Sequence, residues 1–386
     1  MRIIHINCNY LNSELHQNLI ISLTKSKIEN TVFVPTYDKN KSVVNVNKNV
    51  IVSECFKKCD RINFFYKQKK ILKDIKNKVN VSDYNIIHAY TLFTDGNCAY
   101  NLKKEYGIPY IVTIRNTDMN TFLKYMIHLR RRGLKILLDS SKIVFLSKSY
   151  KNRLFNKYIP DEYKLELEKK SIIIPNGIDD FWFKNIFTEK NTSKNIGKFN
   201  DKKIDIVYAG KIDKNKNLGL TIDSIRDLKK KSWDIKFHVA GKIVDPKLFN
   251  SIQNDIIYYG ELEKEELLKL YRKSDIFIMP SHTETFGLVY VEAMSQGLPV
   301  IYTKGEGFDE QFRDGEVGYS VSDTNRIELE NNILKIISNY EDIGSRLYKL
   351  IYAFKWSNIS INYYKIYREL YYEWINFIWK KIKKRW

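Results

Sequence analysis

Two glutamates, Glu284 and Glu292, stand eight positions apart within residues 280–300. The pattern there predicts a buried strand over Ile276–Met279, then a loop, then a helix over residues 287–296. Glu284 is therefore expected beyond the carboxyl end of the strand and Glu292 on the helix. A carboxylate so placed can accept hydrogen bonds from vicinal sugar hydroxyls, as acidic residues do for ribose in dinucleotide sites. The free N–H groups at the start of the helix suit a phosphate.

Positive charge for a diphosphate is expected from the loop after another strand. That strand is predicted over Ile204–Ala209 and ends at Gly210, and Lys211 and Lys216 flank the turn before the next helix. Lysines at such a turn can neutralise a diphosphate as point charges. Alone, these lysines are more typical of a solvated surface. Together with the two glutamates, and with Gly287 allowing close approach to the backbone, they favour a phosphate-binding site.

As a set, these motifs resemble those of the large retaining glycosyltransferase family 4, whose members have the GT-B fold of two Rossmann-like domains. The resemblance covers most of the chain, and its C-terminal motifs are specific as a set, whereas the N-terminal half matches loosely. Lys211 stands where family members usually carry arginine. The segments that carry the resemblance are Glu284–Met294, Gly210–Asn217, Ile174–Asp179 and Gly305–Gly318.

The resemblance implies a hexosyltransferase-type enzyme that moves a sugar, with retention, from a UDP- or GDP-linked donor to a hydroxyl of a glycan or lipid-linked acceptor. It implies bacterial cell-surface polysaccharide or lipopolysaccharide assembly, and neither a cofactor nor a metal. Glu292 would hold the nucleotide ribose, and Glu284 would lie near the transferred sugar. The implied donor-binding residues are Gly210, Lys211, Lys216, Glu284, Phe286, Gly287, Leu288 and Glu292. The implied catalytic residues are Glu284, Asp118 and Lys216.

The acceptor half departs from the family pattern. Arg115 stands where many members have histidine, and an arginine cannot act as a general base at neutral pH. We therefore expect Arg115 and Asn116 to bind the acceptor, with Asp118 as the matching carboxylate. His88 ends another predicted strand, where it either faces the acceptor or packs inside the domain. A nucleotide-sugar epimerase and a non-catalytic sugar-binding protein on the same fold remain alternatives.

The elements that must position these residues alternate along the chain. Short apolar runs rich in β-branched residues read as buried strands, and amphipathic stretches between them read as helices. This pattern predicts an α/β protein with two doubly wound parallel sheets, with ligands bound in the cleft that the two domains face. We expect an N-terminal acceptor domain over residues 1–180, completed by a returning C-terminal helix at residues 361–386, and a donor domain over residues 181–360.

The net charge of +20 in 386 residues is unevenly distributed. Residues 1–180 carry 31 basic and 17 acidic side chains, residues 361–386 carry seven and two, and the part between is nearly neutral. The positive field alone would also fit nucleic acid, but the aromatic residues interleaved with it lie mostly in predicted core segments, so no nucleic-acid partner is expected. No apolar run approaches the length of a bilayer, and the start of the chain reaches polar residues too soon for a signal peptide. The four cysteines lack metal-ligand spacing, which favours free thiols in a reducing compartment.

Two basic stretches suggest an anionic membrane surface as a partner. They are Leu123–Leu138, which contains three consecutive arginines, and the aromatic, lysine-rich tail Tyr371–Trp386. Basic amphipathic helices of this kind bind anionic bilayers. The alternative is that the aromatic residues pack in the core and the basic residues are solvated. The predicted location is the cytoplasm, on the inner face of the cell membrane.

Overall fold

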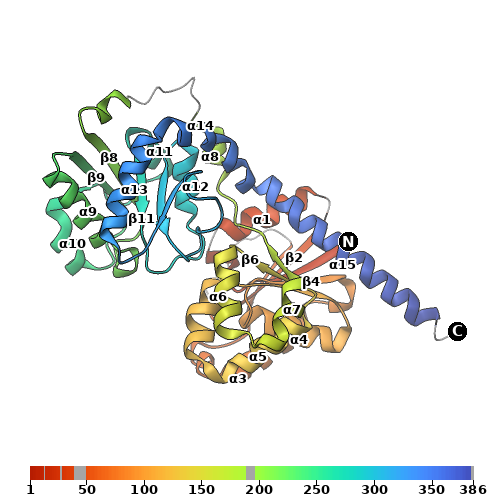
Figure 1. The fold of residues 1–386 in the computed structure, drawn as a ribbon. Coiled ribbons are helices and arrows are strands. Elements are labelled where there is room, and N and C mark those ends of the chain that lie inside the picture. Colours follow the sequence, from red (N-terminus) through yellow and green to blue (C-terminus); the bar gives the residue numbers. More distant parts are fainter. Residues whose placement is uncertain (13, 27, 39–48, 188–195, 384–386) are drawn as a thin grey trace. The chain divides into compact units, whose positions relative to one another are not determined.

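The computed structural model describes residues 1–12, 14–26, 28–38, 49–187 and 196–383, and the chain forms two compact units. Unit 1 comprises residues 1–146, 151–175 and 356–386, and unit 2 comprises residues 147–150 and 176–355. Each unit is built on its own parallel sheet (Figure 1). The predicted α/β class with two doubly wound sheets is confirmed.

Unit 1 contains a seven-stranded parallel sheet in the order β3-β2-β1-β4-β5-β6-β7. Its central strands are buried on both faces, as expected for parallel strands covered by helices. Strand β3 was not predicted, because it lies at the sheet edge and most of its residues are only half-buried. The strands are β1 (Arg2–Ile6), β2 (Glu29–Thr36), β3 (Val50–Glu54), β4 (Ile86–Ala89), β5 (Tyr110–Thr113), β6 (Lys142–Phe145) and β7 (Ser171–Ile173).

The helices of unit 1 cover its sheet on both faces (Figure 1). They are α1 (Glu14–Lys25), α3 (Phe64–Lys78), α4 (Thr94–Tyr106), α5 (Arg130–Asp139), α6 (Lys148–Tyr158), α7 (Asp161–Lys170) and α15 (Trp356–Lys383). Short 3₁₀ turns cover Tyr10–Asn12, Lys58–Ile62, Val81–Asp83 and Ile127–Leu129, and a π-helix covers Asp118–Leu123. The basic stretch expected over Leu123–Leu138 is therefore not one helix, because α5 begins only at Arg130.

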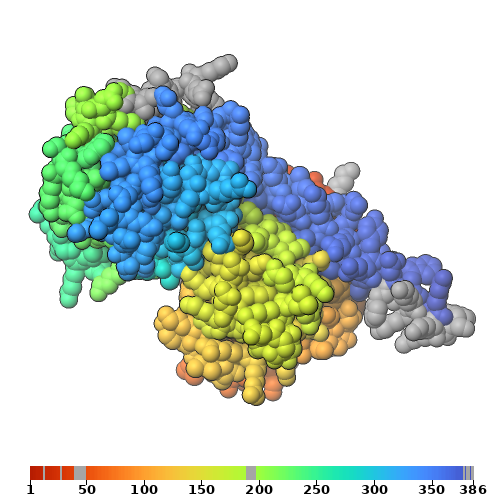
Figure 2. Space-filling view, in the orientation of Figure 1, coloured from red at the N-terminus to blue at the C-terminus, as the bar shows by residue number. Residues whose placement is uncertain are grey.

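The last helix, α15, returns to unit 1, as predicted, and packs beside α1. Its first half supplies Tyr363, Tyr367 and Leu370 to a core shared with β1, β2 and β4. The Tyr367 hydroxyl lies 2.7 Å from Nδ1 of His88 in β4. The carboxyl half of α15 lies at the surface (Figure 2), where Trp379 is 59% exposed. The aromatic residues of this helix thus divide between the core and the solvent.

Unit 2 contains a six-stranded parallel sheet in the order β10-β9-β8-β11-β12-β13. Its strands are β8 (Lys203–Ala209), β9 (Asp234–Ala240), β10 (Ile257–Tyr258), β11 (Ile276–Met279), β12 (Val300–Thr303) and β13 (Gly318–Val321). Its helices are α8 (Asp180–Lys184), α9 (Leu218–Lys230), α10 (Pro246–Ile252), α11 (Lys264–Lys273), α12 (Leu288–Ser295), α13 (Arg326–Ser338) and α14 (Tyr340–Leu350). Short 3₁₀ turns cover Ile196–Phe199, Lys214–Lys216, Gln253–Asp255 and Ile351–Phe354. In the described residues, no helix is both long and apolar enough to cross a membrane.

The attachment of α15 gives a stability prediction. Replacing Tyr367, which is fully buried, with alanine should lower the free energy of unfolding by about 3–5 kcal/mol, because it opens a cavity in the core. Tyr367→Phe keeps the ring and loses only the hydrogen bond to His88, so it should cost about 1 kcal/mol. Urea denaturation followed by tryptophan fluorescence measures both. Equal costs for the two variants would contradict the packing role of the ring.

Candidate functional site

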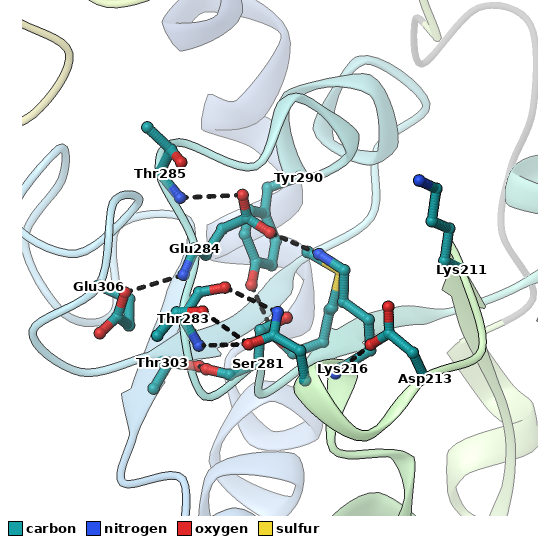
Figure 3. Close-up of polar contacts among 12 residues, drawn as sticks. Lys211, Asp213, Lys216, Ser281, Thr283, Glu284, Thr285, Tyr290, Thr303 and Glu306 are labelled. Atoms are coloured by element: carbon teal, nitrogen blue, oxygen red, sulfur yellow. Dashed lines mark hydrogen bonds and ion pairs between the residues drawn. The ribbon is translucent and has the colours of Figure 1, made fainter. Parts of the chain in front are cut away.

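Glu284 lies in the loop after β11, as predicted, and its carboxylate is held from two sides. Its Oε2 accepts a hydrogen bond of 2.7 Å from the ammonium of Lys216, and its Oε1 accepts one of 3.0 Å from the backbone N–H of Thr285 (Figure 3). Both side chains of the ion pair are mostly buried, with 16% and 19% exposed. The structure therefore joins two predicted site residues that lie 68 positions apart in the chain.

The loop that carries Lys216 is fixed to the loop that carries Glu284. Asn215 donates through Nδ2 to the carbonyl of Thr283 and accepts at Oδ1 from the Thr283 hydroxyl, 2.6 Å away. The Asp213 carboxylate accepts from the backbone N–H of Lys216 and caps this turn. These contacts set the distance between the lysine and the glutamate without help from a ligand.

Glu306, which we did not predict as a site residue, holds the backbone of the same loop. Its Oε2 accepts a hydrogen bond of 2.8 Å from the backbone N–H of Glu284. The neighbouring N–H of Gly307 donates to the Glu284 carbonyl, 2.7 Å away. The only sequence signal for Glu306 was its place in the segment 305–318. Its contact with Glu284 joins loops that follow two different strands, and such a contact has no local sequence pattern.

Gly287 caps the amino end of α12 in a conformation that favours glycine, with φ at +76°. A side chain there would place its Cβ 2.4 Å from the ring of Tyr290 and 3.2 Å from the side chain of Glu284. The Phe286 side chain points into the core, where it is 2% exposed and packs on Phe354, while Leu288 is half-buried. Phe286, Gly287 and Leu288 can thus offer a ligand chiefly their backbone, at the amino end of a helix.

Glu292 lies on α12, near the end of the helix, and is half-buried. Burial raises the pKa of its carboxyl to about 7, and nearby Asp179 adds to the rise, while the ammonium of Lys264 opposes it. Lys264 and Asp179 themselves form an ion pair at 2.8 Å. A hydrogen-bond donor such as a sugar hydroxyl would favour the charged form of Glu292.

Gly210 and Lys211 directly follow β8, at the start of the loop that carries Lys216. Gly210 is in an extended conformation close to Gly241, and the carbonyl of Lys211 accepts a hydrogen bond of 2.6 Å from the Tyr208 hydroxyl. The Lys211 side chain is exposed and lies apart from the Lys216–Glu284 pair (Figure 3). The residues predicted for donor binding all lie in unit 2, where one of the two lysines is paired and the other is exposed.

The residues predicted for catalysis and acceptor binding in unit 1 do not form one cluster of exposed groups. The Asp118 carboxylate is fully buried and accepts hydrogen bonds from the backbone N–H groups of Leu92, Phe93 and Arg115. Burial raises its pKa to about 6, although these three bonds oppose the rise. Asp118 therefore holds the loop after β4 against the loop after β5.

His88 is also fully buried, with Nδ1 at 2.7 Å from the Tyr367 hydroxyl and Nε2 at 2.9 Å from Thr113 Oγ1. Burial lowers its pKa well below the usual value, so the ring is neutral. Of the two placements open for His88, the structure shows the packed one.

Asn116 is exposed, and its side-chain oxygen accepts a hydrogen bond from Asn120. In the described residues, no group of three or more His, Cys, Asp or Glu side chains could hold a metal ion.

Comparison with known families identifies the chain. Residues 189–349 match the family model described as Glycosyl transferases group 1, and residues 17–180 match the model described as Glycosyltransferase Family 4. The chain is a family 4 glycosyltransferase. The predicted family, GT-B fold and enzyme class are confirmed.

Relatives of this glycosyltransferase are distant in sequence. It is 28% identical to an uncharacterized glycosyltransferase of Methanocaldococcus jannaschii over 348 residues, which cover 87% of this chain and 89% of the relative. It is 24% identical to the alpha-monoglucosyldiacylglycerol synthase of Acholeplasma laidlawii, over 81% of this chain and 80% of the relative. Among solved structures, the sucrose-phosphate synthase of Thermosynechococcus elongatus matches 97% of this chain and 100% of its own, with a TM-score of 0.74 at 17% identity.

The raised pKa of Glu292 gives this glycosyltransferase a pH-dependent stability. The folded state keeps the proton up to about pH 7, whereas an unfolded chain releases it near the ordinary glutamate pKa of 4.5. Stability should therefore fall as pH rises between these values. Glu292→Gln should remove that fall and raise the free energy of unfolding at pH 8 by about 1–3 kcal/mol. Thermal unfolding at pH 5 and pH 8 measures it. Identical pH profiles of variant and parent would contradict a buried, protonated Glu292.

Proposed function

We propose that this glycosyltransferase transfers a sugar from a nucleotide-diphosphate donor, bound by unit 2, to a hydroxyl of a glycan or lipid-linked acceptor bound by unit 1. The observation that carries the proposal is the Lys216–Glu284 ion pair beside Gly287 and the amino end of α12. A paired ammonium, the backbone N–H groups at the amino end of a helix and a half-buried carboxylate are groups that suit a diphosphate and a ribose.

In the proposed reaction the bond between the sugar C1 and the diphosphate oxygen breaks, and a bond from C1 to the acceptor oxygen forms. Negative charge develops on the leaving diphosphate, where Lys216, Lys211 and the N–H groups near Gly287 stabilise it. We propose retention at C1, with the acceptor proton passing to the leaving phosphate on the same face. Glu284 would orient the transferred sugar, and Glu292 would accept from the ribose.

Two solved complexes of one structural relative support a nucleotide-sugar donor. HepE of Anabaena, solved in complex with UDP and glucose, matches 96% of this chain and 100% of its own, with a TM-score of 0.67 at 15% identity. The same protein is also known in complex with UDP-glucose. At this identity the likeness concerns the fold, so the donor of this chain, UDP- or GDP-linked, is part of the proposal.

A thermal-shift screen with UDP- and GDP-linked sugars tests the donor site. The true donor should stabilise the protein, and Lys216→Met should weaken its binding about ten- to hundredfold, because a charge-assisted contact to phosphate is lost. Lys216→Arg should retain most of the binding. Lys214→Met is the matched control, because Lys214 is exposed on the same turn and its substitution removes the same charge. Equal effects of Lys214→Met and Lys216→Met, or no stabilising nucleotide sugar at all, would overturn the proposal.

We also propose that the enzyme works in polysaccharide or lipopolysaccharide assembly in the cytoplasm, peripherally on the anionic inner face of a membrane. The excess positive charge of residues 1–180 and 361–386 supports this role, and one relative is named for a glycolipid. The structure narrows the residues that can contribute. Arg130 donates to the Leu123 carbonyl and Arg132 to Asn97 in α4, whereas Arg131 and Lys135 are exposed on α5.

Flotation with phosphatidylcholine vesicles, with and without phosphatidylglycerol, tests the membrane role. The double variant Arg131→Gln, Lys135→Gln should weaken binding to the anionic vesicles by about thirtyfold, since each basic residue contributes about 1 kcal/mol. The control is Lys229→Gln, Lys236→Gln, which removes the same charge from exposed positions of unit 2. Binding that does not depend on phosphatidylglycerol, or that both double variants weaken equally, would rule out Arg131 and Lys135 as the membrane-binding surface.

A further inference from the structure

Unit 1 contains a pocket of about 400 Å³ at the carboxyl ends of β1, β2, β4 and β5. This volume lies in the range of small-molecule sites, and the edge is the one at which open α/β sheets bind ligands. None of Arg115, Asn116 and His88 lines it. Its wall includes five threonines, whose hydroxyls can pair with a sugar, namely Thr36, Thr91, Thr94, Thr117 and Thr121.

Two cations from neighbouring elements line this pocket. Lys67, on α3, has its ammonium 4.8 Å from the ring centre of Phe56. Arg61, at the end of the preceding 3₁₀ turn, has its guanidinium 5.8 Å from the ring centre of Tyr37. The two rings lie 6.0 Å apart, so the aromatic pair supports both cations side by side. Such contacts attract a cation to the ring face but leave its N–H donors available.

Among the described residues, neither cation, Lys67 or Arg61, has a carboxylate as an ion-pair partner. The buried carboxyls nearby have other partners: Asp118 accepts from three backbone N–H groups, and Asp95 accepts from the backbone N–H of Cys8, 3.2 Å away. Asp38 also lines the pocket. Burial lowers the pKa of Lys67 even though Asp95 attracts its charge.

Lys67 is half-buried and has no ion-pair partner among the described residues, which costs free energy that a bound anion would recover. We propose that this pocket binds the anionic group of a saccharide acceptor, a phosphate or a carboxylate, through Lys67 and Arg61, with the sugar against the threonine hydroxyls and the rings of Phe64 and Phe122. That the bound saccharide is the acceptor rests on the proposed function, whereas the anion site itself does not. The anion can come from a soluble sugar or from a lipid headgroup.

Calorimetric titration of the full chain tests the site with glucose 6-phosphate and glucuronate, and with glucose as the neutral probe. Both anionic probes should bind more tightly than glucose, and Lys67→Met should weaken them about ten- to hundredfold. Lys67→Arg should keep most of the affinity. Lys69→Met is the matched control, because Lys69 is exposed on the same helix, lies outside the pocket and removes the same charge.

Dihexanoyl phosphatidylinositol, a soluble lipid phosphate, forms the second arm. If it binds more tightly than glucose 6-phosphate and Lys67→Met abolishes the difference, the anion belongs to a lipid headgroup; the reverse order assigns it to a soluble sugar. No saturable binding of any anionic probe, or equal losses in Lys67→Met and Lys69→Met, would overturn the proposal. Unfolding temperatures of all variants establish that they fold.

The outcome is separable from that of the proposed function. A protein that is stabilised by a nucleotide sugar but binds no anionic probe would refute only the anion site. A protein that binds the anionic probes through Lys67 but no nucleotide sugar would refute the donor proposal and leave the anion site standing.

Discussion

A parallel sheet must be covered on both faces, and this constraint organises the rest of the molecule. In unit 1 the face of β1, β2 and β4 is closed by α1 together with α15, which arrives from the far end of the chain. Because the strands of each sheet are parallel, their carboxyl ends all lie at one edge. The loops that follow these ends are the ones that bind ligands in open α/β sheets. The site loops of unit 2 and the cation-lined pocket of unit 1 both lie at such an edge.

At the edge of the unit 2 sheet, polar groups hold one another before any ligand arrives. Asn215 bridges two loops, Glu306 holds the backbone of Glu284, and Lys216 pairs with the Glu284 carboxylate. Preformed contacts of this kind reduce the entropy that a ligand must pay to order the site. They also mean that a diphosphate would share Lys216 with a carboxylate rather than meet a free ammonium.

Several charged groups here are kept in conditions that disfavour their charge. Glu292 has its pKa raised to about 7, and Lys67 has its pKa lowered, in both cases chiefly by burial. Groups with perturbed pKa values occur most often at functional sites, because the stability they cost is recovered when a ligand of the right charge or hydrogen-bonding capacity binds. Burial disfavours the charged forms of His88 and Asp118 in the same way, but both side chains already have hydrogen-bond partners within unit 1.

The sequence by itself determined the alternation of strands and helices, the family and the loop positions of Glu284 and Lys216, because each rests on local periodicity or on motifs within a few residues. Only the tertiary structure decided which side chains meet. It paired Lys216 with Glu284, packed His88 against Tyr367, and bound Arg130 and Arg132 to other residues of unit 1. Among the residues that the structure describes, it gave Lys67 an aromatic contact but no ion pair. The physical reason is that a charge's partner, and its burial, depend on contacts between segments far apart in the chain, for which no local pattern exists.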